Sequence, residues 1–260
     1  MEKIFWKESV DSTLTWAKEE AKKSVGKELD GALFVANEQT AGKGRLGRVW
    51  TSVPGENIYM TLLLMQPEVR AENASSLTLV MGLSVAEAVE EMAGIDAGIK
   101  WPNDIVLSKK KICGILTEMQ MKEQKPDFIM IGVGINVNQK EFQEELRNKA
   151  TSVFLETGKE MSREELVAKV TACFWKNYEL FLKTQNLKAL KEEYEKRLLN
   201  KNQQVRILEK GTETIGTARG ITDTGELLVE DLQGKVRKVP ARFLSGDYIV
   251  MYKGDKHVQG

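Results

Sequence analysis

The chain has 260 residues with 38 basic and 38 acidic side chains, so its net charge gives no general attraction to nucleic acid or to an anionic membrane. The single histidine, His257, lies near the C-terminus, and the two cysteines lack metal-ligand spacing, which argues against histidine acid–base chemistry and zinc. The apolar stretches are too short to span a bilayer and the N-terminus has no signal-peptide core, so a reduced, cytoplasmic location is expected.

Residues 1–200 alternate between strand and helix patterns, which predicts a mixed α/β domain of a size typical of catalytic domains. Ser12 or Thr13 can cap the first helix, and Ser162 with Glu165 forms a capping box before a longer one. The strands are expected at 3–7, 31–39, 57–65 and 127–138, with two more between 98 and 122 joined by a lysine-rich turn at 109–111. The helices are expected at 13–24, 74–92, 163–183 and 187–199.

The composition changes after Asn200. Short apolar strands then alternate with turns such as Asp223-Thr-Gly225, the pattern of a small all-β unit. We therefore expect a catalytic domain at 1–200 and a small β-barrel at 201–260.

The segment AGKGRLGRVWTS, residues 41–52, contains a G-x-G-x-x-G motif that has three readings. A dinucleotide loop needs a helix at its last glycine, and Pro54-Gly55 leaves no room for one. A kinase loop needs His-Arg-Asp and Asp-Phe-Gly motifs, which the chain lacks. A loop that presents Lys43, Arg45 and Arg48 to a multiply charged anion fits better than a plain basic hairpin.

Two further stretches support an anion site. KWPND, residues 100–104, places an amide and a carboxylate after a proline, and Lys111 follows beside the glycine of KICGIL. GVGIN, residues 132–136, ends a buried strand with two glycines and Asn136.

Together, GKGRLGRVW, KWPNDI, KICGIL, GVGIN and the N-terminal VDSTLTWAKE resemble the biotin protein ligase family in order and spacing, over essentially the whole chain. The resemblance implies an α+β fold, in which a class II synthetase-like domain with a mixed β-sheet flanked by helices is followed by a small SH3-like β-barrel. It also implies a monofunctional form without an N-terminal winged-helix domain. The chain departs from the family pattern at Lys43, which is often arginine, and at Leu14, which is usually asparagine.

The family resemblance implies an ATP-dependent ligase. Biotin's carboxylate attacks the α-phosphate of ATP to give biotinyl-5′-AMP and pyrophosphate. A lysine of a biotin carboxyl carrier protein then takes the biotinyl group and AMP leaves. We expect Mg²⁺ to enter with the ATP phosphates, a homodimer, and no DNA or membrane partner.

The resemblance also assigns residues to roles. The expected catalytic residues are Lys111, Arg48, Arg45 and Asp104. The expected biotin contacts are Ser12, Thr13, Gln39, Gly42, Lys43, Arg45, Lys111, Gly114, Leu116 and Gly132. The expected nucleotide contacts are Arg45, Arg48, Trp50, Asn103 and Asn136, with no assigned metal ligands.

Alternatives remain at this point. A lipoate protein ligase shares the architecture and the adenylation step, but its dithiolane would leave the polar groups of Ser12, Thr13 and Gln39 unpaired. A non-catalytic biotin sensor or DNA-binding regulator is the candidate from another class. A Cys113 acyltransferase is disfavoured, because Cys113 lies within an apolar strand without a histidine partner.

Overall fold

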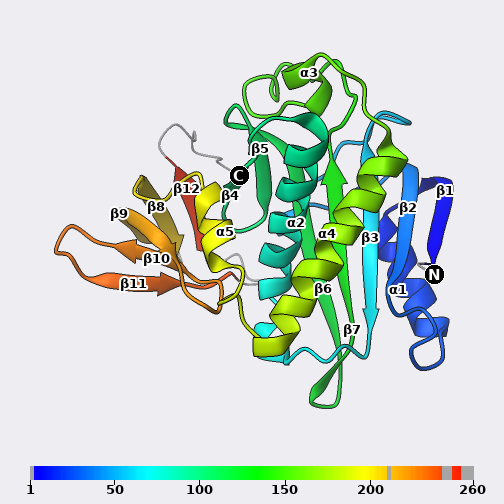
Figure 1. The fold of residues 1–260 in the computed structure, drawn as a ribbon, viewed down its shortest axis with the longest axis horizontal. Helices are drawn as coiled ribbons and strands as arrows, with labels where there is room; N and C mark the ends of the chain where they lie inside the picture. Colours follow the sequence, from blue (N-terminus) through cyan, green and yellow to red (C-terminus); the bar gives the residue numbers. More distant parts are fainter. Residues whose placement is uncertain (1–2, 210–211, 242–247, 253–260) are drawn as a thin grey trace.

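The computed structural model describes residues 3–209, 212–241 and 248–252 (Figure 1). The strands of residues 1–200 are β1 (Ile4–Val10), β2 (Ala32–Gln39), β3 (Ile58–Met65), β4 (Gly98–Lys100), β5 (Asp104–Leu107), β6 (Lys110–Lys122) and β7 (Lys125–Ile135). The helices are α1 (Thr13–Lys23), α2 (Ser76–Ala93), α3 (Val153–Thr157), α4 (Arg163–Thr184) and α5 (Lys191–Arg197).

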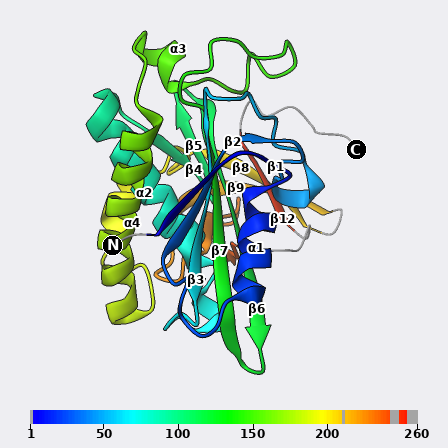
Figure 2. The same cartoon turned by 90° about the vertical axis from the view of Figure 1, so that its right-hand side faces the viewer.

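The seven strands form one sheet in the order β1-β2-β3-β7-β6-β5-β4, in which β1 and β2 are parallel and the other neighbours antiparallel. Figure 2 shows α2 and α4 on one face of the sheet and α1 on the other. Along β3, Met60 and Leu62 face the α2/α4 core, while Leu63 and Met65 face the α1 core. Because both faces are covered, β3 is buried throughout and mostly apolar, as predicted for a strand inside the sheet, and Thr61 is its polar exception.

The hairpin between β5 and β6 corrects the predicted turn at 109–111. Ser108 and Lys109 form the turn with φ of 47° and 67°, so Lys110 and Lys111 already lie in β6. Two consecutive left-handed residues suit a two-residue hairpin, because they match the twist of the flanking strands. The short β4 adds a third strand to the two that were predicted in this region.

The bounds of α1, α2 and α4 are close to the predicted ones, but α5 is shorter, α3 was not predicted, and the predicted side-chain cap at Ser12 is not formed. Ser162 accepts a hydrogen bond from the backbone N–H of Glu165 at 3.1 Å, whereas the Ser12 hydroxyl makes no capping bond. The prediction of a helix over 187–199 is too long, because α5 spans only Lys191–Arg197. The preceding segment instead packs against the β unit, with the Leu187 N–H bonded to the carbonyl of Asp223.

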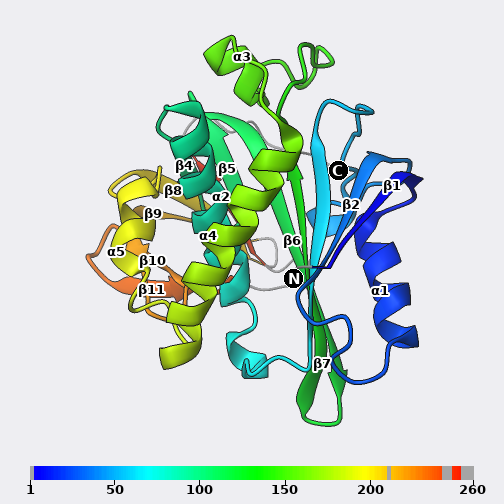
Figure 3. The ribbon, with the colours of Figure 1, turned by 45° about the vertical axis from the view of Figure 1, so that its right-hand side comes forward.

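The remaining strands are β8 (Gln204–Glu209), β9 (Thr212–Ile221), β10 (Leu227–Glu230), β11 (Val236–Val239) and β12 (Tyr248–Tyr252). They form an antiparallel sheet in the order β11-β10-β9-β8-β12, which agrees with the expected SH3-like unit. Its β9–β10 turn lies against the first domain, where Trp101 Nε1 donates to the Gly225 carbonyl and Ser76 Oγ to the Thr224 carbonyl, both at 3.0 Å. Figure 3 shows the β unit beside α5, on the side of the sheet that carries α2. No described helix is long and apolar enough to cross a membrane.

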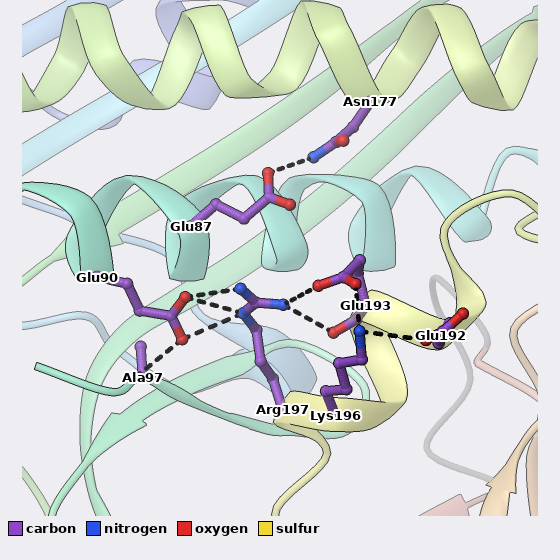
Figure 4. A network of polar contacts seen from close by, with 8 residues as sticks. All are labelled: Glu87, Glu90, Ala97, Asn177, Glu192, Glu193, Lys196 and Arg197. Carbon is purple, nitrogen blue, oxygen red and sulfur yellow. Dashed lines mark hydrogen bonds and ion pairs between the residues drawn. The ribbon is translucent and has the colours of Figure 1, made fainter.

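An ion pair fastens α5 to α2 (Figure 4). Arg197 Nη2 and Nε donate to the Glu90 carboxylate at 2.7 and 3.1 Å, and Nη1 donates to Glu193 at 3.0 Å. Glu90 also accepts from the backbone N–H of Ala97. Only 18% of the Arg197 side chain and 23% of Glu90 are exposed, so water screens this pair less than a surface pair.

Arg197→Ala should lower the free energy of unfolding by about 2 kcal/mol, because it leaves the Glu90 carboxylate half-buried without its cation. Lys196→Ala is the matched control, since Lys196 pairs with Glu192 and Glu193 from the exposed side of the same helix. Urea unfolding measures both values. Equal losses for the two variants would show that burial does not strengthen the Arg197 pair.

Candidate active site

The glycine-rich segment between β2 and β3 folds into a tight hairpin. The Trp50 N–H bonds to the Gly42 carbonyl at 2.9 Å and the Gly44 N–H to the Arg48 carbonyl at 2.7 Å, around a 3₁₀ turn at Arg45–Gly47. A Cβ on Gly42 would lie 2.4 Å from the Trp50 carbonyl oxygen, so this close approach requires glycine. The turn is followed by extended chain and not by a helix, so the loop is not a dinucleotide fingerprint.

The loop lies over a floor made by β6 and β7. Gly114 and Gly134 face each other across these strands, and the Trp50 indole lies over both. A Cβ would come within 2.8 Å of the indole at Gly114 and 2.6 Å at Gly134, and within 2.9 Å of Leu14 at Gly132. Side chains at these positions would displace the residues above them.

A hollow lies between this floor, the loop and the start of α1, and it measures about 450 Å³ when the open space at its mouth is included. It brings together most of the predicted residues from segments far apart in sequence. The predicted residues that line it are Ser12, Thr13, Gln39, Lys43, Arg45, Trp50, Asn103, Lys111, Gly114, Leu116 and Gly132. Five further residues line it and were not predicted as site residues: Leu14, Gly44, Ile115, Val133 and Gly134. The alternation of Gly132 and Gly134 along one strand face was a usable signal.

Four predicted residues do not line the hollow. Gly42 shapes the loop backbone, the side chain of Arg48 is exposed, and Asp104 lies behind Lys111. Asn136 is buried, and its side-chain Nδ2 donates to the Thr151 carbonyl at 3.0 Å, tying β7 to the segment before α3.

One end of the hollow carries neutral polar groups. Gln39 Oε1 accepts from the Thr13 N–H at 2.8 Å and from the Thr13 hydroxyl at 3.1 Å. The Thr13 hydroxyl accepts in turn from Thr61 at 2.9 Å. These bonds fix the orientation of the Gln39 amide through its oxygen, and Nε2 takes no part in them. The Thr13 hydroxyl keeps one further lone pair that can accept a hydrogen bond.

The other end is cationic. Lys111 Nζ lies 2.7 Å from a carboxylate oxygen of Asp104 and 5.3 Å from the centroid of the Trp50 ring. Arg45 Nη1 donates to Asn103 Oδ1 at 2.8 Å. Burial lowers the pKa of Arg45, and the Asp104 carboxylate partly opposes this effect. A cation that has lost hydration in this way favours an anionic ligand.

A second hollow, of about 280 Å³ with the open space at its mouth included, shares wall residues with the first one. Arg45, Asn103 and Leu116 contribute to the walls of both. Thr78 of α2 and Ala241 of the β unit line its far side. The C-terminal unit therefore contributes to the surroundings of the loop.

The structure does not favour Cys113 as a nucleophile at the site. Cys113 is fully buried, and burial raises the pKa of its thiol, with weaker and opposed effects from Lys111 and Asp104. A thiol with a raised pKa that no reagent can reach is not a nucleophile. Within the described ranges, no group of three or more His, Cys, Asp or Glu side chains is arranged to hold a metal ion.

The chain is similar in sequence to known proteins of one enzyme family. Residues 6–136 match the biotin/lipoate A/B protein ligase family, and residues 202–247 match the biotin protein ligase C terminal domain. The chain is 38% identical over 212 residues to the bifunctional ligase/repressor BirA of Bacillus subtilis, covering 81% of this chain and 64% of that protein. It is 31% identical over 234 residues to the biotin–[acetyl-CoA-carboxylase] ligase of Mycobacterium tuberculosis, covering 85% and 81%.

Among solved structures, the biotin protein ligase of Aquifex aeolicus in complex with biotin and ATP is similar, with a TM-score of 0.81 and 32% identity. The match covers 97% of this chain and 100% of that chain. The chain thus spans less than two thirds of the Bacillus subtilis repressor but the full length of the Aquifex aeolicus ligase chain.

The two cysteines should differ in reactivity. Iodoacetamide at pH 8 should label Cys173, which is partly exposed, and leave Cys113 unlabelled until the protein is unfolded in urea. Peptide mass spectrometry after labelling measures each site separately. Labelling of native Cys113 at the rate of Cys173 would contradict its burial and would support a catalytic role for the Cys113 thiol.

Proposed function

Because the chain belongs to the biotin/lipoate A/B protein ligase family, we propose that it is an ATP-dependent ligase that activates biotin as biotinyl-5′-AMP and transfers the biotinyl group to a lysine of a biotin carboxyl carrier protein. One observation carries the proposal: a single hollow has neutral amide and hydroxyl groups at one end and half-buried cations at the other. That arrangement suits a ligand with a polar ring and an acyl phosphate.

The polar end suits the ureido ring of biotin. This ring carries two N–H donors and one carbonyl acceptor, which all need partners once they leave water. The Gln39 amide nitrogen and the Ser12 hydroxyl offer donors, and Thr13 keeps an acceptor lone pair. A dithiolane ring has no hydrogen-bonding groups for this end, which favours biotin over lipoate.

The cationic end suits the first chemical step. A carboxylate oxygen of biotin forms a bond to the α-phosphorus of ATP while the bond to pyrophosphate breaks. The reactants repel each other because both are anions. Lys111 and Arg45, fixed by Asp104 and Asn103, can offset this repulsion without reorganising.

The second step needs an amine at the acyl carbon. The carrier lysine forms an amide with the biotinyl group, AMP leaves, and one proton leaves the amine. Asp104 is the nearest described carboxylate to Lys111, so we assign it the orientation of Lys111 and of the incoming amine. Arg48 and Trp50 remain assigned to the nucleotide, Arg48 from the exposed side of the loop.

The partners complete the proposal. We expect Mg²⁺ to be held chiefly by the ATP phosphates, whose charge it would reduce. The carrier protein, a homodimer and a cytoplasmic location are proposed on the family resemblance together with the two free cysteines.

ATP–pyrophosphate exchange tests the proposal. Purified protein should exchange labelled pyrophosphate into ATP when biotin is present, and not with lipoate or without an acid. Exchange that depends on lipoate would overturn the assignment of the ring-binding end. Binding of biotin without any exchange would make the protein a sensor.

Lys111→Met should reduce biotin-dependent exchange on the order of 10²–10³-fold, by analogy with the loss of one preorganised donor to a transition-state charge. Lys109→Met is the matched control, because Lys109 lies in the exposed β5–β6 turn and should exchange as the parent does. Initial rates at saturating ATP and biotin measure the effect. Equal activity of the two variants would remove Lys111 from the chemistry.

A further inference from the structure

Three successive carbonyl groups in the turn between β9 and β10 each accept a hydrogen bond from the first domain. The bonds run from the Leu187 N–H to Asp223 at 2.7 Å, from Ser76 Oγ to Thr224 at 3.0 Å and from Trp101 Nε1 to Gly225 at 3.0 Å. All three donors belong to buried residues. A donor that lost its carbonyl there would remain without a partner in the core, so these bonds hold the turn firmly.

Gly225 also fits closely against the first domain. Its φ of 87° favours glycine, and a Cβ at this position would lie 3.1 Å from the side chains of both Leu187 and Leu79. Within the turn, the Gly225 N–H bonds to the Thr222 carbonyl at 3.0 Å. The Gly225 carbonyl is therefore a fixed acceptor for the Trp101 indole.

Trp101 differs from the other two donors because it is close in sequence to residues of the first hollow. Trp101, Pro102 and Asn103 form the turn between β4 and β5, and Asp104 is the first residue of β5. Asn103 lines the hollow, and Asp104 lies 2.7 Å from Lys111 Nζ. One short turn thus bonds to the C-terminal unit at its start and carries site residues at its end.

The β4–β5 turn has limited support from its own strands. β4 has three residues and is the edge of the sheet, and a strand of this length makes few ladder bonds. On the side of the floor, the Asn103 carbonyl accepts from the Ile115 N–H at 3.0 Å. On the opposite side, the Trp101 bond ties the turn to Gly225. Contacts outside the β4–β5 ladder therefore contribute much of what places this turn.

We propose that Trp101 is a positioning residue: by fastening the β4–β5 turn to Gly225 of the C-terminal unit, it holds Asp104, and through Asp104 the ammonium group of Lys111. The effect on the reaction rests on the proposed function, whereas the fastening itself belongs to the fold. A displaced carboxylate would aim the Lys111 ammonium less well at the charge that develops on the α-phosphate. The indole acts only through the position of the turn.

Trp101→Phe is the variant that tests the fastening, and Ser76→Ala is its matched control. The first variant keeps an aromatic ring in the core and removes the N–H that reaches Gly225. The second removes another buried donor to the same β9–β10 turn, but Ser76 begins α2 and is not part of the β4–β5 turn. The two variants therefore separate a role of Trp101 from a general weakening of the contact between the domains.

Amide hydrogen exchange of the protein without substrates measures the fastening directly. In Trp101→Phe, the Ile115 N–H that bonds to Asn103 should exchange about tenfold faster, which corresponds to about 1.4 kcal/mol. In Ser76→Ala, the same amide should exchange within about twofold of the parent rate. Parent-like exchange in Trp101→Phe would overturn the fastening, and so would an equal acceleration in Ser76→Ala.

Steady-state ATP–pyrophosphate exchange with biotin measures the effect on the reaction. Trp101→Phe should lower kcat by about tenfold and leave the KM values for ATP and biotin within about twofold, because the lost interaction acts on the transition state. Ser76→Ala should keep the parent kcat. An unchanged kcat in Trp101→Phe, an equal loss in Ser76→Ala, or a raised KM for ATP at unchanged kcat would each overturn the positioning role. If the parent shows no exchange, the proposed function fails, and the Ile115 amide still decides the fastening.

Discussion

The site depends on a steric constraint: three positions on two neighbouring strands carry no side chain. Gly114 and Gly134 lie opposite each other on β6 and β7, and Gly132 lies two residues before Gly134 on the same face of β7. Their backbones are the floor, and Trp50 and Leu14 can approach it closely only because no Cβ intervenes. The polar and cationic groups then stand around a hollow that Trp50 and Leu14 line together with this floor. A strand with ordinary side chains there would fill the same space with core.

The two ends of the hollow differ in charge: one carries neutral polar groups and the other carries cations. The neutral end is a set of interlocked hydrogen bonds among Gln39, Thr13 and Thr61, which fixes what it can offer a ring. At the cationic end, Lys111 has a carboxylate partner while Arg45 has a neutral one. Neutral pairing leaves the charge of Arg45 available to a ligand. This distribution of charge fits catalysis by positioning the reactants and stabilising the transition-state charge, which does not require a histidine.

The sequence predicted the fold wherever one physical signal dominated. The apolar run of β3 and the helical spacing of α2 were read correctly, because burial on both sides of the sheet sets those patterns. The β5–β6 turn was misplaced because lysines suggested a solvated turn, whereas left-handed φ at Ser108 and Lys109 decided it. The segment before α5 bonds through the Leu187 N–H to the Asp223 carbonyl in the β9–β10 turn, a long-range contact that no local sequence pattern reports.

The same distinction applies to the site. The family resemblance predicted most of the residues that line the hollow, but contacts between distant segments determine their hydrogen-bond partners and burial. The Arg45–Asn103 bond joins residues 58 positions apart, and the bond from Asn136 to Thr151 engages a side chain that the motif alone left open to a nucleotide. Such contacts follow from the packing of strands and loops, which the motifs do not encode.

The most direct test of the account is isolation of the intermediate on the protein. The protein is incubated with biotin, ATP, Mg²⁺ and pyrophosphatase but no acceptor, passed through a desalting column, and its bound small molecules are identified by mass spectrometry. The account predicts biotinyl-5′-AMP in an amount close to one per chain. Bound biotin and ATP that remain unreacted would contradict it, because the cations around the floor would then hold the reactants without joining them.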